Sequence, residues 1–197
     1  MTNLLYSFEG CDGSGKSTLS KAVYNALKEA QEPVLLLREP DALRENIMRL
    51  VASKNTPKET IFYLFMADRA YNQPLIQSYL NKGYIVLLDR YIDSTYAYQG
   101  FGQGIPLTLI NSLNQRFIQP HKTFFLDLPI SQSWSRIQDK KKDSFELEGL
   151  SYQETIYAGY KSAALRFSYR FKTLDGTLPL EALVQEVKDT ILTDIYA

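Results

Sequence analysis

The residues best suited to chemistry lie near the start of the chain, in the stretch FEGCDGSGKSTL. Gly10, Gly15, Lys16 and Ser17 fit the spacing G-x-x-x-x-G-K-[ST], which is typical of a loop that wraps phosphate groups. The glycines let successive backbone N–H groups converge on phosphate oxygens, and the following helix adds the positive end of its dipole. Because the lysine reaches the outer phosphates and the serine hydroxyl ligates Mg²⁺, the loop predicts a site for ATP or GTP.

We expect the whole loop to contact ATP. The predicted ATP-binding residues of the loop are Gly10, Cys11, Asp12, Gly13, Ser14, Gly15, Lys16, Ser17 and Thr18. A glycine turn that only joins a strand to a helix is the alternative, but an apolar strand before the loop and an amphipathic helix after it favour the phosphate site. Cys11, the single cysteine, is either a redox-sensitive thiol or a small side chain that the loop tolerates.

A second group of charged residues lies in LFMADRA and LDRYIDSTYAYQG. Asp89 follows the apolar run YIVLL, which places its carboxylate at the carboxyl edge of a sheet, where it is suited to hold Mg²⁺ directly or through water. Arg90 offers a forked cation for a second phosphate, and Arg69 offers another from a helix. Two such arginines indicate an acceptor that is already phosphorylated. An ordinary surface ion pair between Asp68 and Arg69 is the alternative.

Short apolar runs alternate with helical patterns along the whole chain. Strands are expected at 4–8, 34–37, 84–88, 123–128 and 170–174. Helices are expected at 16–29, 43–52, 58–81, 107–117, 131–138, 152–167 and 180–193. Unalternating strands separated by helices predict an α/β fold, a doubly wound parallel five-stranded sheet with helices on both faces, whose ligands bind at the carboxyl ends of the strands.

Length and composition are those of one globular domain spanning residues 1–197, with 45% hydrophobic and 22% charged residues. The formal net charge is zero, so no global field favours nucleic acid or a membrane surface. Apolar runs are too short to span a bilayer, and the start of the chain lacks the pattern of an export signal, so we expect a cytoplasmic protein. The polar, charge-dense segment 138–150 predicts a mobile lid.

On these motifs the chain resembles the thymidylate kinases, a branch of the nucleoside monophosphate kinases, over nearly its full length. The resemblance rests on FEGCDGSGKST, REP, LFMADRA, DRYIDSTYAYQG, TFFLDLP and the stretch from DSFELEGL to YAGY. It implies the P-loop NTP hydrolase fold and transfer of the ATP γ-phosphoryl group to dTMP, giving dTDP and ADP for dTTP synthesis. It also implies Mg²⁺ bound with ATP and a homodimer.

The resemblance further implies a role for individual residues of the acceptor site. Phe65 would stack on thymine, although a core aromatic residue is the alternative there. Thr95 and Gln99 would hydrogen-bond the base, and Tyr98 would lie against the deoxyribose and leave no room for a 2′-hydroxyl, with plain packing as its alternative. Arg69 would span the base edge and the monophosphate.

The same resemblance assigns the groups near the transferred phosphate. Arg90 would clamp the acceptor phosphate, while Asp12 and Glu39 would approach the sugar 3′-hydroxyl or the metal shell. Because Gly13 and Ser14 are uncharged, catalytic positive charge should come from the lid, as in the bacterial type. Its cations would be Arg136 over ATP and the lysines 140–142, of which each could also be a solvated surface charge. The expected catalytic set is Lys16, Arg90, Asp12 and Lys142, with Ser17 and Asp89 as metal ligands.

Two positions depart from the family pattern. The arginine expected one helical turn after REP falls on Met48, and we expect Arg49 to replace it in substrate binding, with Arg44 as the other candidate. In the lid, serine occupies position 144 where an arginine is usual. These departures keep two alternative functions open: a kinase for another deoxynucleotide or nucleoside, and a catalytically weak P-loop protein that binds nucleotides.

Overall fold

The expected parallel sheet is present in the computed structural model, which describes residues 4–53, 55–138 and 149–196. Its five strands are parallel and lie in the order β2-β3-β1-β4-β5. They are β1 (Leu5–Glu9), β2 (Val34–Arg38), β3 (Ile85–Asp89), β4 (Lys122–Asp127) and β5 (Phe171–Asp175). This confirms the predicted fold class, and each strand begins and ends within two residues of its predicted range.

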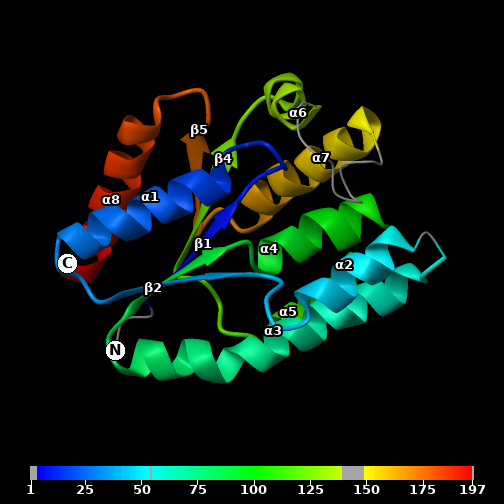
Figure 1. The fold of residues 1–197 in the computed structure, drawn as a ribbon, viewed down its shortest axis with the longest axis horizontal. Helices are drawn as coiled ribbons and strands as arrows, with labels where there is room; N and C mark the ends of the chain where they lie inside the picture. Colours follow the sequence, from blue (N-terminus) through cyan, green and yellow to red (C-terminus); the bar gives the residue numbers. More distant parts are fainter. Residues whose placement is uncertain (1–3, 54, 139–148, 197) are drawn as a thin grey trace.

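Helices cover both faces of the sheet (Figure 1). One face packs on α1 (Lys16–Glu29) and α8 (Leu180–Tyr196), which each bury an apolar residue every fourth position. In α1 these residues are Leu19, Val23 and Leu27, and they share one core with Tyr6 and Phe8 of β1. A stripe of this spacing lies on one side of a helix, so burial on the sheet accounts for both helices.

The other face carries the helices that build the candidate site. Here α3 (Lys58–Asn81) and α7 (Leu150–Arg166) pack on the sheet, Ile76 of α3 against Val86 and Leu88, and Tyr160 of α7 against Phe125. Three of the other helices in the described chain are α2 (Arg44–Ala52), α5 (Leu107–Asn114) and α6 (Ile130–Gln138). Helix α5 ends three residues earlier than the sequence predicts.

One helical segment was not predicted. Residues after β3 form the short helix α4 (Ile92–Thr95), which continues as the π-helix η1 (Tyr96–Gly102). This segment packs closely on α7, because a Cβ atom on Gly159 would lie 2.9 Å from the Cα of Ala97, and one on Gly102 would lie 2.6 Å from Ile156 Cδ1. Wide turns of this kind often occur at functional sites, and η1 carries Tyr98 and Gln99.

Two further expectations concern parts of the chain beyond the fold core. The predicted lid falls largely on residues 139–148, which lie outside the described residues, and so does Lys142. Among the helices described here, none combines the length and the apolar character needed to cross a membrane.

Candidate active site

The phosphate loop joins β1 to α1 at the carboxyl edge of the sheet. Gly13 and Gly15 have φ angles of 76° and 101°, which L-residues with a side chain rarely adopt. A Cβ atom on Gly10 would lie 2.8 Å from Ser14 Oγ and 3.0 Å from the carbonyl of Leu126, so the loop is also tightly packed from below. These glycines leave the backbone free to curve around an anion at the N-terminus of α1.

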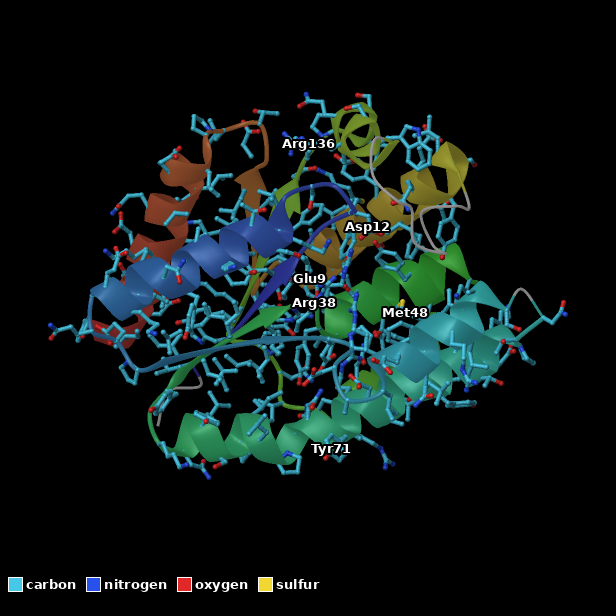
Figure 2. The ribbon with its side chains drawn as sticks, in the orientation of Figure 1. Glu9, Asp12, Arg38, Met48, Tyr71 and Arg136 are labelled. Carbon is cyan, nitrogen blue, oxygen red and sulfur yellow. The ribbon has the colours of Figure 1, made fainter. Side chains whose placement is uncertain are left out.

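Two cations of the predicted ATP site meet this loop. Lys16 is buried, and its ammonium group donates to the carbonyl of Cys11 at 3.4 Å and lies 3.6 Å from Asp12. Burial and the nearby Arg90 lower the pKa of Lys16. Arg136 reaches the loop from α6, donating to the carbonyl of Ser14 at 3.4 Å (Figure 2). Helix α6 therefore places a guanidinium beside the loop, where the sequence predicts one.

The predicted metal ligands lie at the same edge. Asp89 ends β3 in register with Phe8 of β1, and the residue is 5% exposed. Its Oδ1 atom has no hydrogen-bond partner among the described residues, and its Oδ2 atom lies 3.8 Å from Arg38 Nε. Ser17, in the first turn of α1, is exposed. A buried carboxylate oxygen without a partner, together with an exposed hydroxyl, is an oxygen donor set that suits Mg²⁺.

A cavity open to solvent lies next to the loop. Its wall comes from the loop, the end of β2, α2, α3 and the segment from α4 to η1. Of the predicted substrate-binding residues it brings together Asp12, Glu39, Phe65, Arg69, Arg90, Thr95, Tyr98 and Gln99. The cavity therefore gathers most of the predicted substrate-binding residues in one place.

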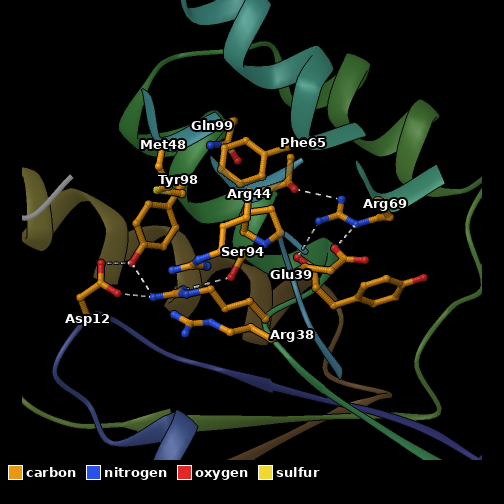
Figure 3. Close-up of a pocket in the computed structure, with 14 residues that line it drawn as sticks. Asp12, Arg38, Glu39, Arg44, Met48, Phe65, Arg69, Ser94, Tyr98 and Gln99 are labelled. Atoms are coloured by element: carbon orange, nitrogen blue, oxygen red, sulfur yellow. Dashed lines mark hydrogen bonds and ion pairs between the residues drawn. The ribbon is translucent and has the colours of Figure 1, made fainter. Parts of the chain in front are cut away.

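The two ends of the cavity differ in chemistry. Phe65, Met48 and Gln99 lie together at one end, whereas Arg38 and Asp12 lie at the other, with Arg44 between them (Figure 3). The first end offers an aromatic face and an amide, which suits a planar base. The second offers forked cations, which suits a phosphate.

Helix α2 supplies a different arginine from the one we expected. Arg44 and Met48 lie one turn apart on the side of α2 that lines the cavity. Arg49 is exposed and does not line it. The prediction that Arg49 binds substrate therefore finds no support in the position of its side chain, and Arg44 occupies the place foreseen for it.

Arg90 is held by five oxygen atoms. Its Nη1 atom donates to the hydroxyls of Tyr160 at 2.9 Å and Ser94 at 3.1 Å, and to the carbonyl of Gly10 at 3.3 Å. Its Nη2 atom donates to Tyr98 at 3.0 Å and forms an ion pair with Asp12. The backbone of Arg90 has a φ angle of 71°, an unusual conformation that the surrounding structure must hold in place.

Asp12 is the anion of this cluster. Burial opposes its ionisation, but Arg90 and Lys16 outweigh that effect and lower the pKa of Asp12 to about 2. Tyr98 donates to the second oxygen of the carboxylate at 2.6 Å. Asp12 is therefore ionised at neutral pH and ties the phosphate loop to Arg90 and to η1.

Arg69 lies deep in the wall of the cavity and is 2% exposed. It donates to Glu39 at 2.8 Å, to Thr95 at 3.0 Å, to Asn114 at 3.2 Å and to the carbonyl of Tyr91 at 3.1 Å. Burial raises the pKa of Glu39 to about 7 although Arg69 opposes the shift, and the Oε1 atom of Glu39 has no hydrogen-bond partner within the described chain.

Asp68 is not the surface charge that the alternative for LFMADRA supposed. It is 1% exposed, and its carboxylate accepts the backbone N–H groups of Asp41 at 3.0 Å and Leu43 at 2.7 Å. It therefore fixes the chain just before α2, the helix that carries Arg44. Both Asp68 and Arg69 are buried, so the alternative of a simple exposed ion pair is wrong.

Sequence reasoning overlooked several residues of the site. Arg38, Tyr91 and Ser94 line the cavity, and Glu9 and Tyr160 lie directly behind Arg90. Among these residues Glu9 could have been noticed in the sequence, since a glutamate in an apolar strand needs buried hydrogen-bond partners. Cys11 is 2% exposed and packs on Phe125, and burial together with Asp12 raises the pKa of its thiol to about 12.

Comparison with known proteins points in one direction. A family model described as Thymidylate kinase matches residues 8–187. Similar curated proteins named Thymidylate kinase occur in Coprothermobacter proteolyticus (34% identical, covering 93% of this chain and 96% of that protein), Thermosipho melanesiensis (34%, 96% and 98%) and Acinetobacter baylyi (34%, 95% and 98%).

Proposed function

Because this chain belongs to the thymidylate kinase family and is an ATP-dependent dTMP kinase, we propose that the cavity binds dTMP while the phosphate loop binds ATP. The observation that carries the proposal is the polarity of the cavity. Its cationic end, with Arg38 and Arg90, adjoins the phosphate loop, Arg44 lies between the two ends, and the aromatic end lies farther away. A nucleotide in this orientation presents its phosphate to the γ-phosphate of ATP.

At the far end, Phe65 stacks on thymine, a contact worth about 1–3 kcal/mol per base in other proteins. Thr95 and Gln99, which are 1% and 2% exposed, offer hydrogen bonds to the base edge. Arg69 uses four of its five N–H groups on partners within the described chain, so it has one left for the nucleotide.

The sugar lies between the two ends. Tyr98 is held by its bond to Asp12, so its ring forms a fixed wall that leaves no space for a 2′-hydroxyl. Glu39 lines the same cavity and Asp12 lies toward its cationic end, and both carboxylates are suited to accept a hydrogen bond from the 3′-hydroxyl.

Catalysis then consists of positioning and charge neutralisation. An oxygen of the dTMP phosphate attacks the γ-phosphorus in line, the bond to the bridging β,γ-oxygen breaks, and ADP leaves with the electron pair. The attacking oxygen is already anionic, so no protein base is required. Lys16 and Arg90 stabilise the charge that develops, and Arg136 and Lys142 add cations from the ATP side.

Asp89 and Ser17 are the residues that would hold Mg²⁺, as the unpartnered Oδ1 atom of Asp89 supports. When bound with ATP, the ion supplies further neutralisation of phosphate charge. The segment 138–150 acts as a lid that excludes water on closing, which suppresses hydrolysis of ATP. We also propose that the chain is a single domain and works in the cytoplasm.

A homodimer is supported by one face of α3. From Tyr63 to Ser78 every exposed side chain of this helix is uncharged: Tyr63, Ala67, Ala70, Tyr71, Pro74, Leu75, Gln77 and Ser78. Figure 2 shows Tyr71 on the side of α3 that faces away from the sheet, and Tyr71 is 74% exposed. An apolar stripe of this length on a helix that packs with its other side is typical of a subunit interface.

Sedimentation tests the dimer. The wild-type chain and an Asn25→Glu control, which adds the same charge at an exposed position of α1 on the other face of the sheet, should sediment as dimers, whereas Tyr71→Glu should sediment as a monomer. A dimer of unchanged affinity in Tyr71→Glu would overturn this assignment.

A coupled ADP-release assay with several acceptors tests the cavity assignment. Turnover should be highest with dTMP, lower with dUMP and dCMP, and negligible with thymidine, because thymidine brings no phosphate to the arginines. Calorimetry should show dTMP binding without ATP. Binding of thymidine as tight as that of dTMP would refute a phosphate site at Arg38, Arg44 and Arg90.

A further inference from the structure

Glu9 lies behind the catalytic arginine and touches neither it nor the cavity. It ends β1, is fully buried and accepts three hydrogen bonds: from the backbone N–H of Tyr91 at 2.7 Å, from Ser94 at 2.6 Å and from Tyr160 at 3.1 Å. The same two hydroxyls accept from Arg90 Nη1. Three elements of the fold, β1, α4 and α7, therefore meet at one carboxylate.

The direction of each hydrogen bond follows from the chemistry of the groups. Arginine can only donate, and a serine or tyrosine hydroxyl has one hydrogen to give. The hydrogens of Ser94 and Tyr160 must therefore point away from Arg90, either both at Glu9 or one through the other, since the two oxygens lie 2.9 Å apart. In either arrangement the hydrogens end on Glu9, and the lone pairs of both hydroxyls face Arg90.

We propose that Glu9 is a positioning residue for phosphoryl transfer, because its carboxylate orients the hydroxyls of Ser94 and Tyr160 as acceptors and thereby holds the Arg90 guanidinium at the acceptor phosphate. This inference rests on the proposed role of Arg90. Backbone strain at Arg90 supports it, since a residue with a φ angle of 71° needs external restraint to keep its side chain in one place.

The surroundings of Glu9 have opposing effects on its ionisation, with a net rise of its pKa. Burial and the nearby Asp93 raise its pKa, whereas the bond from Ser94, the charge of Arg90 and the N–H of Tyr91 oppose the shift. Three donors converge on the carboxyl group, and the shortest contact, at 2.6 Å, has the length of an O–H···O⁻ bond.

Glu9→Gln tests the inference because it keeps the shape and removes one acceptor. If the amide oxygen faces Tyr91, the NH₂ group faces the hydroxyls and at least one of their hydrogens turns toward Arg90. If the amide is flipped, its NH₂ group faces the N–H of Tyr91. Each orientation therefore brings two hydrogen-bond donors face to face. Removing the hydroxyls of Ser94 and Tyr160 relieves this conflict only when the amide oxygen faces Tyr91.

The experiment is a double-mutant cycle on kcat at saturating ATP and dTMP. We expect Glu9→Gln to lower kcat by about 10- to 100-fold in the wild-type background, which is less than or equal to the smallest loss, about 10²-fold, that follows complete removal of one catalytic donor. In the Ser94→Ala/Tyr160→Phe background the same change should cost less than threefold, since the groups through which Glu9 acts are gone. The Kd of ATP should stay within twofold throughout.

Controls separate positioning from folding. Asp194→Asn neutralises a carboxylate that pairs with Lys122 at the opposite end of the sheet, and should keep kcat. Circular dichroism at the assay temperature reports whether each variant is folded. An equal loss of kcat in both backgrounds, or an unchanged kcat in both folded Glu9→Gln and folded Glu9→Ala, which removes the acceptor altogether, would overturn the inference. If Arg90→Ala itself turned over normally, the proposed role of Arg90 would fail first, so the two failures are distinguishable.

Discussion

Arg90→Ala is expected to slow phosphoryl transfer by about 10³-fold while leaving ATP binding within threefold of wild type. Loss of one preorganised donor from a site of developing charge typically costs about 10²–10³ in kcat. Both terminal nitrogens of Arg90 are bound by the cluster of Ser94, Tyr98 and Tyr160, which by our proposal faces the acceptor phosphate, so the upper end of that range applies. A factor of 10³ corresponds to about 4 kcal/mol of transition-state stabilisation.

The ATP site should be spared because the loop amides, Lys16 and Arg136 bind the triphosphate without Arg90. Arg90→Lys keeps the charge but loses the fork, so it should recover only about tenfold of the loss. Arginine and alanine pay the same backbone cost at a φ angle of 71°, so that cost cancels in the comparison.

The assay is pre-steady-state formation of dTDP at saturating substrates, with ATP affinity measured by calorimetry. Arg116→Ala, an exposed arginine outside the cavity, serves as the control and should turn over normally. A single-turnover rate of Arg90→Ala within threefold of wild type would refute the reasoning, because it would show that the acceptor phosphate is neutralised by other groups.

Buried groups give three further predictions. Folding raises the pKa of Glu39 from 4.5 to about 7, so ionising this carboxyl group destabilises the folded state as the pH rises through that range. The free energy of unfolding should therefore fall by up to about 3 kcal/mol between pH 4.5 and 7.5. Urea titrations at a series of pH values measure this dependence, and Glu39→Gln should flatten it. Arg170→Met leaves the buried carboxylate of Asp93 without its ion-pair partner, so the free energy of unfolding should fall by about 3–5 kcal/mol in thermal and urea unfolding. The double variant Arg170→Met/Asp93→Leu should restore most of this stability. Equal losses in the single and the double variant would contradict this prediction. Cys11, whose thiol pKa is raised to about 12 by burial, should resist alkylation by iodoacetamide at pH 8 in the folded protein and react at once in urea.

Much of the fold could be predicted from local patterns in the sequence. The bounds of α1 and α3 agree with the prediction at both ends. In α1 the buried apolar residues Leu19, Val23 and Leu27 lie at every fourth position, a spacing that can be seen in the local sequence. The segment from α4 to η1 was missed because its conformation depends on distant partners. Gly102 and Gly159 let it lie against α7, a contact between residues more than fifty positions apart that no local pattern encodes.

The choice between Arg44 and Arg49 shows what the sequence could still have offered. Successive helical residues are about 100° apart, so Arg44 and Met48 share a face and Arg49 does not. Ile47 is fully buried and marks the inner side of α2. The position of each arginine around the helix relative to the buried apolar residue therefore indicates which arginine points into the site, provided that the helix is known to lie over the site.

The position of Arg90 illustrates the limit of motif reading. A motif names the residue that carries charge, but the orientation of that charge comes from groups with no motif of their own: a glutamate that ends β1, a serine from α4 and a tyrosine from α7. Buried polar groups must be paired, so each one implies a partner even where the partner cannot be named in advance. A glutamate that ends an apolar strand is therefore informative in the sequence itself: it predicts that hydroxyl or amide donors converge at the carboxyl edge of the sheet, where the phosphates meet.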